Sequence, residues 1–331
     1  RHWLERCTSN HTCNILPEDQ IRFRPTRLVN TGLDGTVRLE NGKDSSLPYA
    51  TLSYRWGSGA SLKLTHETYE SFKHAIPWDD IPTTLRDSIN LCRSLNITYI
   101  WIDALCIVQC DPELCVNQCG AEDWKSEGAQ MAEVYRNGLV CLAASDSEDT
   151  TAGCLWERGP AFQGLQIQGN QILYPHCSYD FFLRSGLNNR AWCLQEKLLS
   201  RRTVYLTING AWMECLADVV SEGFPVHMPN SFRVKKNSPD RKGLSLLLQL
   251  WGEITSDYAA RQLTRWSDRL VALEAVLSSL TKCQFLGRQR FGHWQCLLPW
   301  DLLWSCPESE IPRQRLQEND ISLPSWSWIS V

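Results

Sequence analysis

Residues 49–57 read YATLSYRWG, and this stretch decides the fold class of the chain. The run that ends at RWG is continuous and largely apolar, which is typical of a strand buried on both faces of a sheet. Two similar runs follow, because residues 99–107 read YIWIDALCI and residues 139–145 read LVCLAAS. We predict that all three runs are strands of one sheet.

Helical patterns separate these runs. Residues 85–95 carry apolar side chains at helical spacing, Thr83 or Thr84 can cap the helix, and Asn96 ends it. A second helix is predicted over residues 124–135. Alternation of buried strands with helices is typical of a parallel sheet that is covered by helices on both faces. The predicted fold class is therefore α/β.

The segments outside this core have other patterns. Residues 21–24 and 36–40 alternate like edge strands or a hairpin. Residues 203–215 predict a β-hairpin that turns at Asn209-Gly210. We expect three parts: an N-terminal β extension over residues 1–46, the α/β core domain over residues 47–215, and a mainly helical, Trp-rich region over residues 216–331 that packs on the core.

Composition restricts the classes of partner. The chain has 331 residues, of which 43% are hydrophobic and 21% are charged, and its formal net charge is −4. Such a chain can bury a large core, and its charge gives no general attraction to nucleic acid or to anionic membranes. No apolar run is long enough to span a bilayer, and the N-terminus shows no signal-peptide pattern. We expect a soluble cytoplasmic protein without a nucleic-acid partner or a membrane span.

The fifteen cysteines are interpreted as thiols rather than as a disulfide framework. Their number is odd, the chain is long, and Cys106 and Cys141 lie in apolar runs, where cysteine behaves as a small hydrophobic residue. Cys106, Cys110, Cys115 and Cys119 follow one another closely, but they lack the paired CxxC spacing of zinc sites. The motifs of zinc proteases, serine hydrolases, P-loop proteins and classical dinucleotide-binding proteins are missing from the sequence. We expect no metal site and no bound cofactor.

Residues 190–200 read RAWCLQEKLLS and predict an amphipathic helix with Lys197 on its charged rim. The helix carries one carboxylate, Glu196, close to Trp192. Two interpretations are open at this point. Glu196 could be a structural partner of a neighbouring arginine, or a catalytic carboxylate whose pKa is raised by nearby apolar surface.

Polar and aromatic residues follow the first two predicted strands. Ser53, Arg55 and Trp56 come at the end of the first strand, and we expect Asp103 to end the second strand. In parallel α/β sheets, ligands bind beyond the carboxyl ends of the strands. Arg55 could hold a phosphate, Trp56 could stack on a base, and Asp103 could bind a ribose hydroxyl. Alternatively, Trp56 is a packing residue, and Arg55 forms an internal ion pair with Asp103.

Five blocks of the sequence resemble the fungal heterokaryon incompatibility (HET) domain family. The blocks occur in the family's order and span nearly the whole chain. They read YATLSYRWG (49–57), YIWIDALCI (99–107), MAEVY (131–135), RAWCLQE (190–196) and LPSWSW (323–328). The HET family is similar, more remotely, to the TIR domain, which implies a TIR-like core with a flavodoxin-like strand order.

The resemblance also implies an activity. In TIR domains that cleave NAD, a glutamate on the corresponding helix is catalytic, which points to Glu196 here and to NAD as the substrate. Ser53, Arg55, Trp56, Asp103 and Trp192 are then the candidate residues for NAD binding. The chain departs from the TIR pattern in a long insertion over residues 146–189 and in RWG after the first strand.

The same resemblance implies a biological role. We expect a fungal protein of non-self recognition that self-associates, responds to an incompatibility partner protein and triggers cell death. Two alternatives stay open. The domain could be a non-enzymatic death-signalling module that works through oligomeric contacts, or a biosynthetic enzyme that uses the same crevice for a small molecule.

Overall fold

The computed structural model of this protein describes residues 1–14, 23–57, 62–110, 119–157, 165–166, 172–173, 185–222, 244–263, 268–281, 286–305 and 324–330. The chain divides into two compact units. The first unit comprises Arg1–Leu187 and Leu199–Val234, and the second comprises Asn188–Leu198 and Lys235–Val331. The division into three parts expected from the sequence, with boundaries after residues 46 and 215, stays a prediction.

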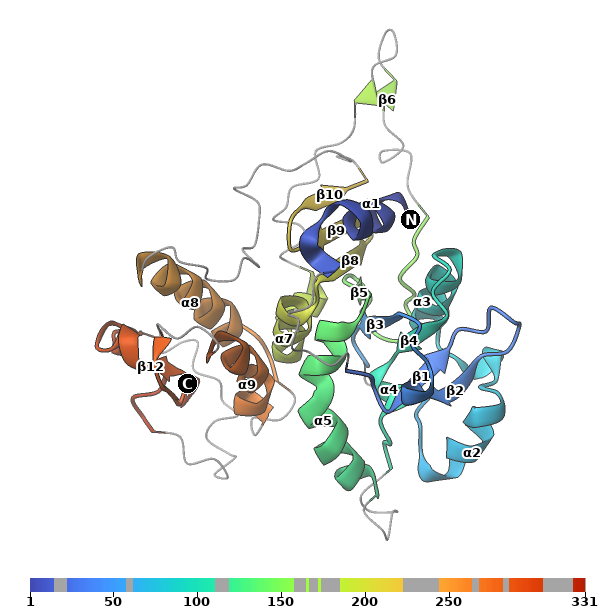
Figure 1. The fold of residues 1–331 in the computed structure, drawn as a ribbon, viewed down its shortest axis with the longest axis horizontal. Helices are drawn as coiled ribbons and strands as arrows, with labels where there is room; N and C mark the ends of the chain where they lie inside the picture. The colour runs from blue at the N-terminus through green and yellow to red at the C-terminus, as the bar shows by residue number, and fades with distance from the viewer. Residues whose placement is uncertain are drawn as a thin grey trace. The chain divides into compact units, whose positions relative to one another are not determined.

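An eight-stranded sheet forms the centre of the first unit, in the order β10-β9-β8-β5-β3-β4-β1-β2 (Figure 1). Its four central strands are parallel to one another. Two antiparallel strands extend the sheet on each side. The central strands are β4 (Tyr99–Trp101), β3 (Tyr49–Ser53), β5 (Val140–Ala144) and β8 (Arg202–Thr207), and the outer ones are β1 (Arg27–Asn30), β2 (Arg38–Asn41), β9 (Gly210–Cys215) and β10 (Val219–Ser221).

Every residue of β3, β4 and β5 is buried, as expected for strands that are covered on both faces. The path from β3 to β4 runs through α3 (Thr83–Ser94), and the path from β4 to β5 runs through α5 (Cys119–Asn137) in the opposite direction along the sheet. Right-handed crossovers therefore place α3 and α5 on opposite faces. The α/β fold class predicted from the sequence is confirmed.

Aromatic side chains fasten α5 to the sheet. The Tyr49 hydroxyl donates to the carbonyl of Val134 at 2.7 Å, and the Tyr135 hydroxyl donates to the carbonyl of Leu52 at 3.1 Å. The Trp101 and Tyr135 rings meet edge to face with centroids 5.8 Å apart. These contacts position α5 over the middle of the sheet.

Three expectations about the first unit need correction. The second run is a strand only over Tyr99–Trp101, since Asp103–Cys106 form a short helix, α4. The Asp103 carboxylate accepts a hydrogen bond from the Ala104 backbone N–H at 2.7 Å, which favours the helical turn. No threonine side chain caps α3, because the Thr84 hydroxyl donates to the carbonyl of Asp149 at 3.0 Å instead.

The third correction concerns the N-terminal segment. It begins with a helix, α1 (His2–Asn10), and its first strand is Arg27–Asn30 rather than residues 21–24, of which 21 and 22 lie outside the described residues. Both N-terminal strands belong to the central sheet. The hairpin of β8 and β9 is confirmed, with Thr207 opposite Gly210. The first unit also contains α2 (His66–His74) and a pair of short strands, β6 (Leu165–Gln166) and β7 (Ile172–Leu173).

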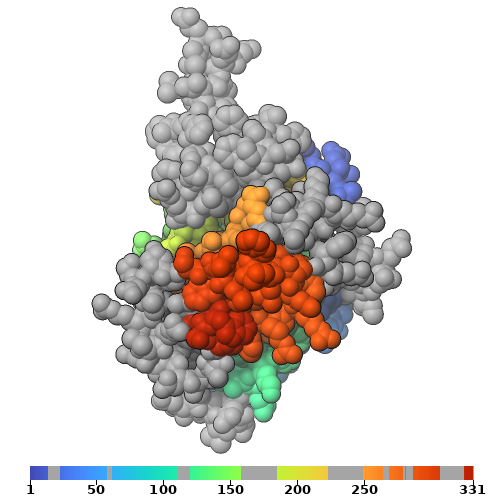
Figure 2. All heavy atoms as spheres, turned by 90° about the vertical axis from the view of Figure 1, so that its left-hand side faces the viewer, coloured from blue at the N-terminus to red at the C-terminus, as the bar shows by residue number. Residues whose placement is uncertain are grey.

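The second unit is built around tryptophans. The Trp251 ring meets those of Trp294 and Trp328 edge to face at 5.9 and 6.1 Å, and all three side chains are buried. Figure 2 shows residues 324–330 against residues 286–305, where the Trp328 indole donates to the carbonyl of Gly292 at 2.9 Å. The helices and strands of the second unit are α7 (Ala191–Leu199), α8 (Leu244–Ala259), α9 (Asp268–Thr281), β11 (Gln289–Arg290) and β12 (His293–Trp294). Among the described residues of both units, no helix is long and apolar enough to cross a bilayer.

Candidate functional site

The loop after β3 carries three of the predicted binding residues. Ser53 ends the strand and is buried, and Arg55 and Trp56 follow in partly buried positions. Gly57 then takes a φ of +75°, and a Cβ atom at this position would lie 2.4 Å from the Cβ atom of Asp149. Only glycine fits so close an approach, so the loop after β3 lies directly against the segment that follows β5.

Trp56 and Asp103 are joined by a hydrogen bond. The indole Nε1 donates to Oδ2 of Asp103 at 2.8 Å, while Oδ1 accepts from the Ala104 backbone at 2.7 Å. The ammonium of Lys63 lies 5.4 Å from the centroid of the Trp56 ring, a cation–π contact. The sequence named Arg55 as the internal partner of Asp103, and the structure gives that carboxylate a bond to Trp56.

Arg55 faces two segments of the first unit. A Cβ atom at Gly186 would lie 3.1 Å from its Nη1 atom, so the guanidinium borders the segment before α7. Its charge also acts on Asp149, whose carboxyl has a lowered pKa. The largest cause is the hydrogen bond from the Thr151 hydroxyl, followed by backbone N–H groups, with a smaller contribution from the charge of Arg55. A planar guanidinium at this place can bind a phosphate through two donors.

The residues after β5 complete this edge of the sheet. Asp146 accepts a hydrogen bond from the Ile208 backbone N–H at 2.9 Å, which joins the end of β5 to the end of β8. Sequence reasoning missed Asp146 and Asp149. The signal was present, because the acidic run SDSED over residues 145–149 follows the third apolar run directly, where ligand-binding residues of parallel sheets lie.

Glu196 and Trp192 belong to α7, in the second unit. Glu196 is 8% exposed. Ala191 and Leu194 of the same helix belong to the tryptophan-rich core of the second unit, and Trp192 packs against this core. Lys197, which was expected on a charged rim, is only 6% exposed.

The start of α7 is held by backbone contacts within the second unit. The Ala191 N–H donates to the carbonyl of Gln262 at 3.0 Å, and Arg261 donates to the carbonyl of Arg190 at 3.0 Å. Four of the six predicted site residues therefore gather at the ends of β3 and β4, and two lie on α7.

Two cavities border other parts of the described chain. One of about 660 Å³ lies beside β2 and includes Glu40, Tyr69 and Tyr99 in its lining. The other, of about 940 Å³, belongs to the second unit and includes Arg288, His293 and Trp326. Neither lining contains a residue predicted to bind NAD.

The fold and this edge define a class: an α/β protein with a central parallel sheet and polar residues at the carboxyl ends of its strands. Residues 49–196 match the family model described as heterokaryon incompatibility protein (HET). The match begins at the first residue of β3 and ends at Glu196, so it includes all six predicted site residues. The resemblance of the sequence to the heterokaryon incompatibility family is thus confirmed over residues 49–196, which form a HET domain. No curated protein and no solved structure matches the chain.

Proposed function

We propose that this protein acts in fungal non-self recognition and that its HET domain triggers regulated cell death by hydrolysing NAD. The observation that carries the proposal is the position of Arg55 and Trp56 at the carboxyl end of β3. The parallel strands run in the order β4-β3-β5-β8. We take this order as support for the flavodoxin-like arrangement that the resemblance to TIR domains implies. In such sheets the ligand binds where the strand order reverses, which here is between β3 and β5.

Each candidate residue has a role under this proposal. Arg55 binds the diphosphate of NAD, Trp56 stacks on a ring of the substrate, and Ser53 lines the floor of the site. Asp103 holds the Trp56 indole in place and so acts as a positioning residue. Trp192, which lies on the same helix as Glu196, is proposed as a further substrate-binding residue.

Glu196 is the proposed catalytic residue. The bond between nicotinamide and ribose breaks through an oxocarbenium-like transition state, whose positive charge a carboxylate stabilises. Water then adds to the ribose carbon, and the products are nicotinamide, ADP-ribose and a proton. We further propose that activation involves self-association in the cytoplasm, set off by an incompatibility partner protein.

The test is nicotinamide release from NAD by the purified, concentrated protein, with Glu196→Gln alongside. The control is Glu67→Gln, an exposed glutamate in the first turn of α2. We expect release by the wild type and by Glu67→Gln, and loss of at least about a hundredfold in Glu196→Gln, as is typical when a charge-stabilising group is removed. Release that persists in Glu196→Gln would contradict the assignment of this residue.

A second function is favoured by one specific observation. The Trp56 indole N–H and the Asp103 carboxylate are hydrogen-bonded to each other, and Lys63 lies over the Trp56 ring. Two of the side chains proposed to bind NAD are therefore already in contact with other residues of the protein. This arrangement suits a rigid signalling module that works through oligomeric contacts. Under that function, Glu196→Gln would keep the cell-death phenotype in a fungal host, whereas under NAD hydrolysis it would lose both cell death and NAD consumption.

A further inference from the structure

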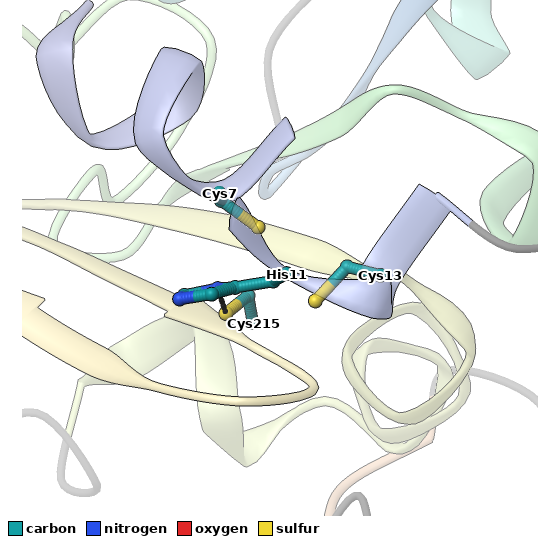
Figure 3. Close-up of side chains that lie close together, drawn as sticks. All are labelled: Cys7, His11, Cys13 and Cys215. Atoms are coloured by element: carbon teal, nitrogen blue, oxygen red, sulfur yellow. Dashed lines mark hydrogen bonds between the residues drawn. The ribbon is translucent and has the colours of Figure 1, made fainter. Parts of the chain in front are cut away.

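Four residues that are far apart in the sequence meet beside the outer strands of the sheet. Cys7 and His11 come from α1 and its C-cap, Cys13 comes from the following turn, and Cys215 ends β9, 204 residues after His11. Their ligand atoms, three Sγ atoms and one imidazole nitrogen, all lie within 4.8 Å of one another (Figure 3). The three thiols are buried, and His11 is partly buried. From these contacts we infer that Cys7, His11, Cys13 and Cys215 form a structural zinc site.

The donor set selects the metal. Thiolate and imidazole ligands in a group of four favour zinc, whereas magnesium and calcium require oxygen ligands. In a tetrahedral site with Zn–S bonds of about 2.3 Å, the ligand atoms lie about 3.8 Å apart. Cys215 Sγ and His11 Nδ1 are already 3.4 Å apart, so small side-chain rotations suffice to complete the tetrahedron. A cavity of about 20 Å³, enough for one small occupant, borders Cys7, His11 and Cys215.

Hydrogen bonds around the sulfur atoms support the same inference. The backbone N–H groups of Ala217 and Asp218 both donate to Cys215 Sγ, at 3.4 and 3.2 Å. Nε of Arg202 donates to Cys7 Sγ at 3.0 Å, and this arginine is only 1% exposed. Donors aimed at sulfur stabilise thiolates and are the outer contacts that metal-bound cysteines receive.

The charges of the cluster also balance with a zinc ion. A buried guanidinium needs a compensating negative charge. Three thiolates and one neutral imidazole around Zn²⁺ leave one excess negative charge, which Arg202 neutralises.

The site has a structural consequence. The Cys7, His11 and Cys13 side chains come from the first fourteen residues, and Cys215 lies at the turn between β9 and β10. In the structure, α1 contacts this edge of the sheet through a small apolar cluster that includes Met213 and Val220, and through the ion pair of Arg6 with Asp218 at 3.9 Å. Zinc would thus fix the N-terminal helix to the β9–β10 edge of the sheet, and this role is independent of NAD hydrolysis.

The test is the zinc content of the full chain, purified under reducing conditions without chelators, by elemental analysis. We expect about one zinc per chain in the wild type and in the control Cys110→Ser, and less than about a tenth in Cys13→Ser and Cys215→Ser. His11→Ala should lose zinc, and His11→Cys should regain it, because a fourth thiolate is an equally good ligand.

A readout on the wild-type chain avoids any dependence on the folding of variants. Exchange of the metal for Co²⁺ should give the visible bands of a tetrahedral site and a thiolate charge-transfer band, both in proportion to bound cobalt. A chelator should lower the midpoint of thermal unfolding and increase proteolysis within residues 1–14. A wild-type chain without zinc that holds a disulfide between two of the three cysteines, or equal zinc in wild type and Cys215→Ser, would overturn the inference.

Discussion

The indole N–H of Trp56 donates to Oδ2 of Asp103 at 2.8 Å and joins the loop after β3 to the helical turn after β4. The two strands are parallel neighbours, with Thr51 opposite Trp101. The bond therefore holds together the two strand ends where the predicted binding residues gather. Because Oδ1 of the same carboxylate accepts from Ala104, Asp103 supports both the loop and the start of α4.

Loss of this bond should destabilise the first unit. Asp103→Ala removes two hydrogen bonds from a partly buried site, and we expect a loss of about 1–3 kcal/mol in the free energy of unfolding. Trp56→Phe removes the same bond from the other side. Urea unfolding of both single variants and the double variant gives the coupling energy. Full additivity of the two losses would show that the bond contributes nothing.

Gly57→Ala should destabilise the protein more than the same change at another glycine with positive φ. At Gly57 a Cβ atom would lie 2.4 Å from Cβ of Asp149, whereas at Gly35, with a φ of +108°, nothing lies within 4 Å. Backbone strain alone costs about 1–3 kcal/mol, and the overlap at Gly57 adds to that cost. Thermal unfolding of both variants tests the difference, and equal midpoints would argue against the close approach of the two loops.

Substitution of Trp326 and of Trp328 by alanine should lower the free energy of unfolding by very different amounts. Trp328 is 6% exposed and meets Trp251 and Tyr258 edge to face, whereas Trp326 is 47% exposed. We expect Trp328→Ala to cost about 3–5 kcal/mol, as is typical of a buried aromatic side chain. Trp326→Ala should cost less than about 1 kcal/mol, in the range of surface changes. Denaturant unfolding followed by circular dichroism compares them, and a reversed order would contradict the packing of this segment.

Glu40 should make the first unit sensitive to acid. Burial by itself raises the pKa of this carboxyl, but hydrogen bonds from Tyr99 and Asn30 and the charge of Arg38 outweigh it and lower the pKa. A lowered folded-state pKa stabilises the protein above the unfolded value of about 4.3, and this contribution is lost as the pH falls through the folded-state pKa. The stability of Glu40→Gln between pH 3 and 7 should fall less steeply toward acid than that of the wild type. Parallel curves for the two proteins would show that Glu40 makes no such contribution.

Local patterns in the sequence predicted the buried strands, because short and continuous apolar runs between helical patterns are typical of strands covered on both faces. The run at residues 99–107 shows where such reasoning fails. Its apolar character continues past Trp101, but Asp103 accepts from the next backbone N–H and starts a helical turn. An apolar run cannot distinguish a buried strand from a buried helical turn by periodicity alone.

Local sequence patterns could not predict contacts between residues that are far apart in the sequence. The spacing Cys7-x3-His11-x-Cys13 is visible in the sequence. The fourth residue of the proposed zinc site, Cys215, lies about two hundred residues later, on β9, next to the edge strand β10. The pairing of Trp56 with Asp103 likewise depends on the order of β3 and β4. Predicted strand ends identified Ser53, Arg55, Trp56 and Asp103 as neighbours, but they could not specify which side chain bonds to which.

The most direct test of the central claim is an equilibrium titration of NAD against the Glu196→Gln protein, in which the substrate should not be consumed. We predict saturable binding of NAD, weakened at least about tenfold when Arg55→Ala is added, because a bidentate contact to phosphate is lost. The same affinity with and without Arg55, or no binding to the Glu196→Gln protein, would contradict an NAD site at the carboxyl ends of β3 and β5.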